Sequence, residues 1–375
     1  MKVVQIAPSA TTNGGVQTQV LALTRGLLKQ GVAVHAVIFE DGPLSEIYRE
    51  QGIPADVIGG KSGHDVAAML RMRKILRSSD ADIIHFHLHP ILMGIAFAGV
   101  RQPLVRTFHW GPVCFSWKDR IIELLESCSS GMRKIGGWGA VSEYVQNWVL
   151  RDEPRLETIS HQLIYNCIDI ARFRPETEES VTTLENDFRE HRFRIGMVCR
   201  VAPDKHPLDA IHLIRILRDE YHISAQLTMI GDGPQLAECR QLAQSLELDS
   251  QIDFTGNRVD PETFLRKCHV SLAFSNSETF GLSILEGIAC GAPVISYRSR
   301  GALQEWLHEG EGCLYADTFS PQAAANRVVS LFRSVESWRE LRQHGLDLAK
   351  RFSSQKCASQ YIELYEEVLR QRTVS

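Results

Sequence analysis

Short apolar runs alternate with amphipathic segments along the first half of the chain. Each run is typical of a buried strand. The runs span residues 3–7, 33–39, 55–58, 82–86, 103–108, 139–141 and 163–166. Segments with apolar residues at helical spacing, such as residues 16–28, separate most of them. Strands that alternate with helices predict βαβ units and a parallel sheet.

The same alternation starts again in the second half of the chain. Its apolar runs span residues 193–199, 225–230, 252–254, 269–274 and 293–297, and residues 320–370 are mostly helical by pattern. The polar, acidic segment 176–190 indicates a linker or a surface excursion. We therefore predict an α/β protein with two Rossmann-like domains that face each other across a cleft. The expected domains are residues 1–175 and 176–352, and a C-terminal helix in residues 353–375 is expected to pack back on the first domain.

Composition narrows the class of protein. The 375 residues carry a net charge of −4, which argues against a nucleic-acid partner. The nine cysteines are dispersed without a C-x-x-C pair, so neither a zinc cluster nor a disulfide framework is indicated. No apolar run is long enough to span a bilayer, and the first residues form a strand pattern and not a signal sequence. We expect a protein of the reducing cytoplasm.

Residues 275–287 follow one predicted strand and open one predicted helix. If this helix begins near Gly281, the backbone N–H groups of Phe280, Gly281 and Leu282 lie at its N-terminus, a position that favours a phosphate. Glu278 lies in the turn, and Glu286 lies about 8 Å along the helix at about 1.5 Å per residue. Two carboxylates around an anion site suit a sugar–diphosphate–ribose ligand. Alternatively, Glu278 interacts only with the helix dipole and Glu286 is a solvated helix position.

Cationic and polar residues also follow other predicted strands. Arg200 and Lys205 come after strand 193–199, where together they could neutralise a diphosphate or remain solvated surface cations. His109 ends strand 103–108, so it is expected at the cleft or in a structural hydrogen bond. Gly14 and Gly15 end the first strand-to-helix loop, where they either allow close approach to an anion or form a flexible turn. This turn lacks the G-x-G-x-x-G motif, which disfavours a dinucleotide-dependent dehydrogenase.

His85, His87 and His89 occupy alternate positions of one strand pattern and would share one face of it. A metal site is conceivable there, but no carboxylate or cysteine with ligand spacing accompanies them. The favoured interpretation is a polar strand end that lines the cleft. Asp80 and Asp82 match a D-x-D motif of metal-dependent transferases, yet they lie at the start of a strand. We interpret that match as coincidence and expect no metal.

Two amphipathic segments could rest on an anionic membrane surface. The first is a basic helical face formed by Arg71, Arg73, Lys74 and Arg77. The second combines apolar and basic residues in segment 117–125, which includes Trp117, Lys118 and Arg120. The alternative, ordinary helices that pack on a core, is favoured for both.

Taken together, these motifs resemble the retaining GT-B glycosyltransferases of family 4, in the family's order and over nearly the whole chain. The strongest match is the spacing of Glu278 and Glu286, which have seven residues between them as in the family's E-x7-E motif. The other matching segments are Gly14-Gly15-Val16, the strand that leads to His87, Thr107-Phe108-His109, Val141-Ser142, Asn166-Cys167-Ile168-Asp169, Arg200 with Lys205, Ile230-Gly231-Asp232-Gly233-Pro234, Phe254-Thr255-Gly256, Gly301 and Glu305. Cys167 and Gly287 depart from the family, which usually has Gly and Ala at these two positions.

The resemblance implies a role for each matching residue. The expected catalytic residues are His109, beside the reacting carbon, and Glu278, on hydroxyls of the transferred sugar. Residues expected to bind the sugar donor are Gly15, Arg200, Lys205, Phe280, Gly281, Leu282 and Glu286, with Arg200 and Lys205 on the diphosphate and Glu286 on the ribose. Front-face displacement with retained anomeric configuration is implied, without a metal or other cofactor.

The function predicted from this resemblance is transfer of a hexose-type sugar from a nucleotide-diphosphate sugar to a glycan or lipid-linked glycan, as in cell-surface polysaccharide synthesis. Peripheral contact with the inner face of the membrane would fit such an acceptor. Two alternatives remain open. One is a GT-B nucleotide-sugar epimerase, which would convert the sugar nucleotide without an acceptor. The other is a non-catalytic GT-B scaffold subunit, which the joint presence of Arg200, Lys205, Glu278, Glu286 and His109 disfavours.

Overall fold

The computed structural model describes residues 1–7, 14–60, 65–87, 93–110 and 135–374. The chain divides into two units: unit 1 comprises Met1–Cys167 and Ser354–Ser375, and unit 2 comprises Ile168–Ser353. The first boundary therefore lies at residue 167 and not at the expected residue 175. Residues 168–174 belong to unit 2 because the Ile168 N–H donates to the Phe352 carbonyl at 2.9 Å and Arg172 pairs with Glu262 at 2.8 Å.

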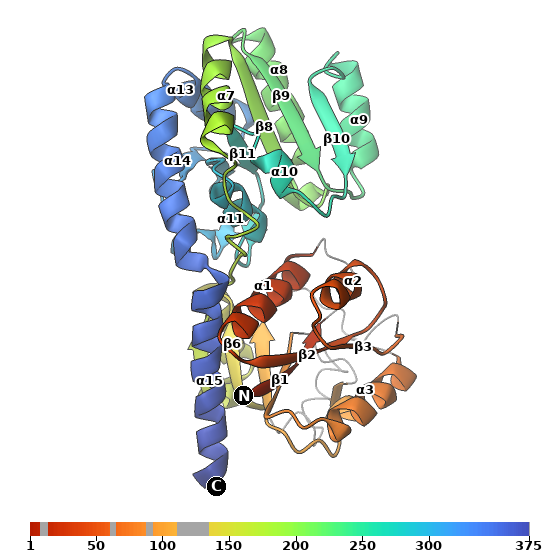
Figure 1. Cartoon of the computed structure of the whole chain (residues 1–375). Coiled ribbons are helices and arrows are strands. Elements are labelled where there is room, and N and C mark those ends of the chain that lie inside the picture. The colour runs from red at the N-terminus through yellow and green to blue at the C-terminus, as the bar shows by residue number, and fades with distance from the viewer. Residues whose placement is uncertain (8–13, 61–64, 88–92, 111–134, 375) are drawn as a thin grey trace. The chain divides into compact units, whose positions relative to one another are not determined.

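Unit 1 is built on a seven-stranded parallel sheet in the order β3-β2-β1-β4-β5-β6-β7 (Figure 1). Its strands are β1 (Lys2–Ala7), β2 (Ala33–Ile38), β3 (Ala55–Val57), β4 (Ile83–Phe86), β5 (Leu104–Phe108), β6 (Ile135–Ala140) and β7 (Ser160–Leu163). Its helices are α1 (Gly15–Lys29), α2 (Pro43–Glu50), α3 (Val66–Ser78), α4 (Met93–Phe97), α6 (Glu143–Asp152), the 3₁₀ helix η2 (Pro154–Thr158) and α15 (Ser354–Val374). The last strand ends at Leu163, so the strand predicted over residues 163–166 lies too far along the chain.

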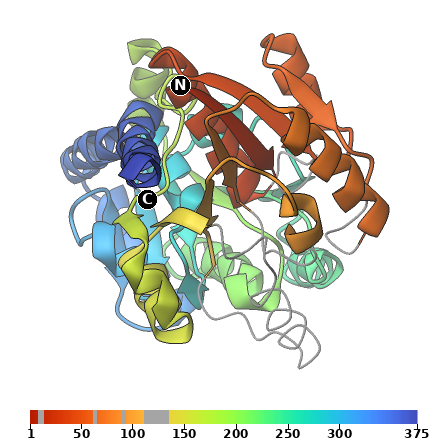
Figure 2. The ribbon, with the colours of Figure 1, turned by 90° about the horizontal axis from the view of Figure 1, so that it is seen from below.

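Helices cover both faces of the unit 1 sheet. Helices α3 and α4 pack on the face that includes Val4 and Phe86, and α1 and α15 pack on the face that includes Val3 and Val105 (Figure 2). Strand β6 begins before the predicted residue 139 because its glycines leave room for α15. A Cβ atom on Gly137 would lie 2.5 Å from the Val368 side chain. The low intrinsic strand propensity of glycine concealed this stretch from the apolar pattern.

Unit 2 contains a six-stranded parallel sheet in the order β10-β9-β8-β11-β13-β15. Its strands are β8 (Arg192–Val198), β9 (Ser224–Ile230), β10 (Ile252–Gly256), β11 (Val270–Ala273), β13 (Val294–Tyr297) and β15 (Cys313–Ala316), and a separate pair is formed by β12 (Ser277–Glu278) and β14 (Arg300–Gly301). Its helices are α7 (Glu178–Arg189), η3 (Pro203–Lys205), α8 (Pro207–Asp219), α9 (Leu236–Ser245), α10 (Glu262–Leu265), α11 (Leu282–Ala289), α12 (Leu303–Trp306), α13 (Pro321–Phe332), α14 (Val335–Ala349) and η4 (Lys350–Phe352). The prediction of two α/β domains with parallel sheets is confirmed.

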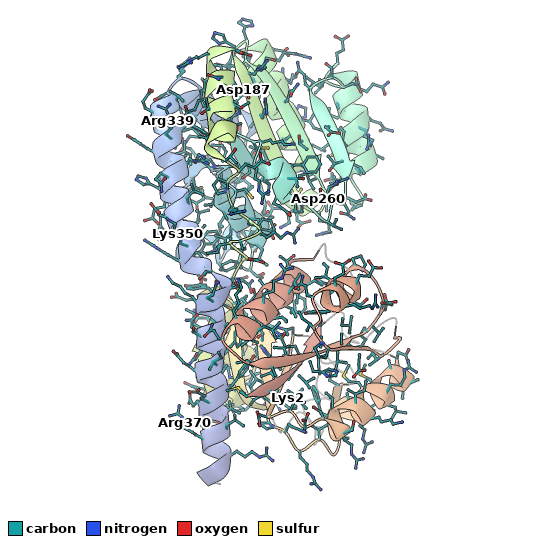
Figure 3. All side chains as sticks on the ribbon, viewed as in Figure 1. Lys2, Asp187, Asp260, Arg339, Lys350 and Arg370 are labelled. Atoms are coloured by element: carbon teal, nitrogen blue, oxygen red, sulfur yellow. The ribbon has the colours of Figure 1, made fainter. Side chains whose placement is uncertain are left out.

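Segment 176–190 is not the linker that its composition indicated, because helix α7 occupies most of it. Leu184 is buried against the unit, and Asp187, labelled in Figure 3, is fully buried. The Asp187 carboxylate pairs with Arg192 at 2.9 Å and Arg194 at 3.0 Å on strand β8. A buried charge is tolerated when it is paired and hydrogen-bonded, so these ion pairs fix α7 to the sheet. Strand β15 was not predicted, since its four residues are a short run between Gly312 and the polar residue Asp317.

Candidate functional site

In each sheet, the order of strands reverses at one point, where ligands of open α/β sheets usually bind outside the carboxyl ends of the strands. In unit 2 this point lies between β8 and β11, which pair in parallel. The loops that leave these two strands contain Arg200, Lys205 and Glu278. In unit 1 it lies between β1 and β4, the strands that precede Gly15 and His87. The candidate residues of each unit therefore lie at the expected edge of its sheet.

The loop after β8 is held in place by the loop after β9. The Val201 N–H donates to the Asp232 carbonyl at 2.9 Å, and the Cys199 N–H donates to the Ile230 carbonyl at 3.1 Å. The backbones approach so closely that a Cβ atom on Gly231 would lie 1.8 Å from the Cys199 carbonyl oxygen. This contact requires a glycine at residue 231, the first position of the Gly-Asp-Gly-Pro motif. It also fixes the backbone of the segment that contains Arg200.

Arg200 and Lys205 leave this loop with different surroundings. The Arg200 guanidinium is mostly exposed and lies 2.9 Å from Asp204. The Lys205 ammonium is mostly buried, and its Nζ atom lies 2.6 Å from Oε1 of Glu278. The alternative of two solvated surface cations is therefore wrong for Lys205 and remains open for Arg200.

The loop after β11 is bound directly to the loop after β8. The Asn276 N–H donates to the Asp204 carbonyl at 2.9 Å, and the Asn276 amide oxygen lies 2.7 Å from His206 Nε2. Ser275 Oγ donates to the same Glu278 oxygen that Lys205 contacts, at 2.6 Å. Glu278 is thus an ion-pair partner within the site and not merely an acid near a helix dipole.

The backbone of Glu278 is fixed by the short pairing of β12 with β14. The Ala302 N–H donates to the Glu278 carbonyl at 2.8 Å. Gly301 has φ +93°, and a Cβ atom there would lie 2.3 Å from the Glu278 carbonyl oxygen. A glycine is required at this approach, which gives the small-residue position noted in the sequence a structural cause.

Helix α11 begins directly after this pairing. Its N-cap is Gly281 with φ +92°, and the Ile284 N–H donates back to the Gly281 carbonyl at 3.1 Å. The Leu282 N–H belongs to the first turn of the helix, where N–H groups have no carbonyl acceptor within the helix, and so lies at its positive end. Phe280 is buried, its ring is stacked on Trp306, and its carbonyl accepts the Trp306 indole N–H at 2.9 Å. These contacts fix the angle at which the helix enters the site.

Glu286 lies one turn along α11 and is only 7% exposed. The alternative of a solvated helix position is therefore wrong. Burial raises the pKa of Glu286 to about 8, and nearby Arg172 opposes this rise. Arg172 is itself held by both carboxylate oxygens of Glu262, at 3.0 and 2.8 Å. A buried carboxyl near an oriented cation is a group that a polar ligand can engage.

The two departures from the family pattern have local explanations. The backbone N–H of Cys167 donates to Oε1 of buried Gln19 at 3.0 Å, and its thiol lies 3.2 Å from the same oxygen. Cys167 thereby attaches the end of the first segment of unit 1 to helix α1. A Cβ atom on Gly287 would lie 2.6 Å from Ser271 Oγ on β11, so Ser271 occupies the space of the usual methyl group.

In unit 1, Gly15 is the first residue of helix α1 and His109 follows strand β5. His109 is buried, and its Nε2 atom lies 3.1 Å from Nδ1 of His87. His85 has separate partners: its Nδ1 atom lies 2.6 Å from the Tyr365 hydroxyl and its Nε2 atom 2.7 Å from Thr107 Oγ1. Burial lowers the pKa of His85 and of His109 to about 3, so both are neutral at pH 7.

The structure gives no support to a metal site among the described residues. No three side chains of His, Cys, Asp or Glu there are arranged to hold a metal ion. Asp80 and Asp82 lie at the start of β4, where Asp80 pairs with the Lys2 ammonium and Asp82 accepts the Lys2 backbone N–H at 2.8 Å. Both carboxylates therefore contact Lys2 at the start of the strand. His89 and segment 117–125 lie outside the described residues.

Several residues that organise the site were not predicted from the sequence. Ser275, Asn276 and His206 link the two loops, and Arg172 and Glu262 lie beside Glu286. The first three lie next to motif residues and could have been included by proximity. Arg172 is close to Glu286 only through the fold, since 113 residues separate them in the chain and nothing local marks the pair.

Two family models match the chain in successive segments. The model described as Glycosyltransferase Family 4 matches residues 13–172, and the model described as Glycosyl transferases group 1 matches residues 184–346. Their order is the order of the two sheets along the chain.

Similar proteins include several with named activities. N-acetyl-alpha-D-glucosaminyl L-malate synthase of Bacillus anthracis is 25% identical over 315 residues, which cover 82% of this chain and 80% of that protein. Alpha-monoglucosyldiacylglycerol synthase of Streptococcus pneumoniae is 26% identical over 312 residues, which cover 76% of this chain and 68% of that protein.

Solved structures share the fold over nearly the whole chain. Anabaena Alr3699/HepE in complex with UDP and glucose has a TM-score of 0.79 at 20% identity, covering 97% of this chain and 98% of that one. Sucrose-phosphate synthase from Thermosynechococcus elongatus has a TM-score of 0.75 at 18% identity, covering 99% and 100%. At identities this low, the structural similarity establishes a common fold and nothing further.

Proposed function

The chain belongs to the GT-B glycosyltransferases of family 4, and from this premise we propose that it transfers a hexose-type sugar from a nucleotide-diphosphate sugar to a glycan or lipid-linked glycan, with retained anomeric configuration. The observation that carries the proposal is the convergence of Arg200, Lys205 and Glu278 with the N-terminus of α11 at the switch point of unit 2. Cations and helix N-termini bind phosphate, and carboxylates bind sugar hydroxyls.

The diphosphate is assigned to the cationic part of this arrangement. Arg200 is exposed enough to turn toward a ligand, and its present partner Asp204 is also exposed. Lys205 has an ammonium with three N–H donors, so it can contact phosphate oxygens while it remains near Glu278. The backbone N–H groups at Gly281 and Leu282 lie at the N-terminus of α11 and add the positive end of a helix, and Phe280 precedes the N-cap. Gly15, at the N-terminus of α1, is assigned to the same ligand.

The sugar and ribose are assigned to the two carboxyl groups. Lys205 and Ser275 both contact Oε1 of Glu278, and we assign Oε2, which has no hydrogen-bond contact to the described part of the chain, to hydroxyls of the sugar. Glu286 is assigned to the ribose hydroxyls. A ligand that forms hydrogen bonds with the buried Glu286 carboxyl compensates for its loss of hydration.

The reaction follows from these assignments. The bond between the anomeric carbon and the diphosphate oxygen breaks, and the electron pair leaves with the nucleoside diphosphate. The acceptor hydroxyl attacks from the same face, and its proton passes to the departing phosphate oxygen. Arg200, Lys205 and the α11 N-terminus stabilise the negative charge that develops on this leaving group. His109 is assigned to the sugar near the reacting carbon. None of these steps uses a metal.

A lipid-linked acceptor would bring the protein to a membrane surface, and α3 offers a suitable face. Val66 is 49% exposed and Leu70 is 50% exposed, and Lys74 and Arg77 follow them along the same side of the helix. The four cations named in the sequence differ in their surroundings: Arg71, Lys74 and Arg77 are exposed, and Arg73 is half-buried. Arg71 donates to the Ile58 and Gly59 carbonyls, and the guanidinium groups of Arg73 and Arg77 both lie beside Gly99.

We propose that α3 contacts anionic lipid through this apolar and basic face. The described part of the chain contains no helix long and apolar enough to cross a bilayer. Contact of this kind would be peripheral, and its affinity would depend on the negative charge of the lipid.

The overall proposal is tested by turnover. The protein is incubated with sugar conjugates of UDP, GDP and ADP and with a set of glycan and lipid-linked acceptors, and nucleoside diphosphate release is followed by NMR. The expected result is acceptor-dependent release with one of the three nucleotides and a product with the same anomeric configuration as the sugar donor. An inverted product contradicts the retaining mechanism, and conversion of the sugar nucleotide without an acceptor favours an epimerase.

A further inference from the structure

A line of buried polar side chains runs along one face of the unit 1 sheet toward its carboxyl edge. In this sheet Gln5 pairs with His85 on the adjacent strand, and Thr107 follows two residues after Val105, the partner of His85 on the next strand. Alternate residues of a strand share a face, so His87 and His109 continue the line. Helices α1 and α15 cover this face. Burial of polar side chains costs free energy that apolar side chains would not cost, so a function is expected for these polar groups.

His85 is fixed at both ring nitrogens by this network. Its Nδ1 atom lies 2.6 Å from the Tyr365 hydroxyl and its Nε2 atom 2.7 Å from Thr107 Oγ1, which in turn lies 2.7 Å from the Tyr361 hydroxyl. A neutral imidazole has one N–H and one acceptor nitrogen, so both are used. The ring of His87 packs beside it with a centroid separation of 4.0 Å. The ring of His85 is therefore held in a fixed orientation, and the ring of His87 packs against it.

His87 has a partner at only one of its nitrogens. Nδ1 lies 3.1 Å from Nε2 of His109, whereas Nε2 is sealed from solvent and has no hydrogen-bond partner among the described residues. If His109 donated, the single proton of His87 would sit on Nε2 as a buried N–H without an acceptor. If His87 Nδ1–H donates, Nε2 is a bare acceptor, and orphaned buried N–H groups are the rarer of the two. The second arrangement is favoured.

From this geometry we infer that His87 is a positioning residue that donates from Nδ1 to His109 Nε2 and thereby holds His109 as the tautomer with its proton on Nδ1. The protonated nitrogen of His109 then has no hydrogen-bond partner among the described residues and is available to a ligand. His109 acts as a hydrogen-bond donor at a fixed angle, and its Nε2 atom is not available as a general base.

The electrostatic surroundings are consistent with two neutral rings. Burial lowers the pKa of His87 well below its usual range, and the neighbouring His85 and His109 add to this. Burial lowers the pKa of His109, and Arg106 contributes in the same direction. Arg106 is also buried, packs on the Phe108 ring and lies 3.8 Å from Glu153. A cation close to the pair disfavours a second positive charge on either imidazole.

The inference rests on the proposed function in one respect, namely that His109 contacts the transferred sugar. In that role, an N–H aimed at a sugar oxygen favours the geometry and charge of the transition state more than tight binding of the nucleotide. Loss of the His87 donor should therefore lower kcat and leave the KM for the sugar nucleotide nearly unchanged.

The tautomer is tested by NMR of the full chain with ¹⁵N-labelled histidine, in which long-range proton–nitrogen couplings identify the protonated nitrogen. The His109 signals are assigned from His109→Gln. We expect His109 to carry its proton on Nδ1 from pH 6 to 8 and to move to a different tautomer balance in His87→Leu. A proton on Nε2 of His109 in the wild-type chain would overturn the inference, whatever the enzyme transfers.

Steady-state kinetics of His87 variants distinguish a role in positioning His109 from a role in stabilising the fold. The Asn side chain carries an N–H near the place of His Nδ1, so His87→Asn should restore His109's Nδ1 tautomer and most of kcat. His87→Leu should lower kcat about tenfold or more, with KM for the sugar nucleotide changed less than about twofold. His308→Gln, at an exposed position in unit 2, is the control. Equal losses in His87→Leu and His87→Asn would contradict positioning. Unchanged turnover in His109→Gln with the expected tautomer would instead contradict the proposed role of His109.

Discussion

The Lys205 ammonium lies 2.6 Å from Glu278 Oε1, and through this contact the loops that follow β8 and β11 meet at the switch point of unit 2. Ser275 donates to the same oxygen. The pair is mostly buried, so each charge holds the other in place before a ligand binds. A diphosphate would add negative charge on the Lys205 side and leave the second Glu278 oxygen to the sugar.

Lys205→Ala should reduce turnover about 100-fold or more, because it removes a preorganised charge that stabilises the leaving diphosphate. Steady-state release of nucleoside diphosphate measures the effect. Lys267→Ala, which removes an exposed lysine from the same unit, should retain wild-type turnover. Comparable losses in both variants would mean that Lys205 has no special relation to the reaction.

Glu286→Gln should remove a pH dependence that the Glu286 carboxyl gives to the stability of the wild type. Because the pKa of Glu286 is raised to about 8 from an ordinary value of 4.5, the folded chain keeps a proton that the unfolded chain releases within this range. Stability of the wild type is then fully present below about pH 4.5 and is lost as pH rises through about 8.

The measurement is Tm from pH 4.5 to 8.5. Glu286→Gln should match the wild type at pH 4.5 and exceed its Tm by about 3 °C or more at pH 8.5, since each kcal/mol corresponds to about 2–4 °C in a domain of this size. Glu340→Gln, at an exposed position of α14, should follow the wild type throughout. A constant Tm difference across the pH range would show that Glu286 does not titrate as its burial requires.

Much of the fold and of the site could be predicted from local patterns. The apolar runs located nearly all strands of both sheets, and the E-x7-E spacing marked Glu278 and Glu286 as candidate residues beside the start of α11. These features are local because a strand must bury its side chains and a helix must start at a cap. The missed start of β6 and the missed helix α7 depend instead on distant partners, namely Val368 on α15 and the arginines of β8.

The state of each site residue could not be predicted, since it depends on contacts between distant segments. From the sequence, Glu286 could be a ligand-binding carboxylate or a solvated helix position. The fold buries it near Arg172. His87 and His85 looked equivalent, as alternate residues of one strand. Only the structure shows that His85 is bound at both nitrogens and that, among the described residues, His87 is bound at one.

Gly301→Ala should destabilise the loop that carries Glu278. The loss should be larger than that caused by an alanine at another glycine with positive φ, because a Cβ atom on residue 301 also clashes with the Glu278 carbonyl. Gly310 provides a matched control, because it has φ +84° and open space within 4 Å of the position that a Cβ atom would take, whereas Gly301 has φ +93° and a clash at 2.3 Å. Both alanine variants carry a conformational cost of roughly 1–2 kcal/mol. Gly301→Ala should have a Tm several degrees lower than Gly310→Ala, at about 2–4 °C per kcal/mol, and lower turnover. Equal Tm and equal turnover would show that the Glu278 carbonyl does not require a glycine opposite it.

The basic and apolar face of α3 predicts charge-dependent binding to lipid. In sedimentation with vesicles, the wild type should bind phosphatidylglycerol more than phosphatidylcholine, and added salt should weaken the binding. The double variant Lys74→Glu/Arg77→Glu should lose this preference. Lys267→Glu/Arg333→Glu makes the same change in net charge at exposed positions of unit 2 and should retain it. Equal loss in the two double variants would point to net charge and not to α3.

In our proposal, the carboxyl edge of the unit 2 sheet binds a nucleotide-diphosphate sugar through Lys205 and Glu286. Calorimetric titration with UDP, GDP and ADP, in the wild type and in Lys205→Ala, Glu286→Ala and Lys267→Ala, measures this directly. We predict saturable binding of one nucleotide to the wild type and to Lys267→Ala, and about tenfold or weaker affinity in the other two variants, as expected for loss of about 1.4 kcal/mol. Binding of none of the three nucleotides, or equal affinity in all four proteins, would contradict the claim.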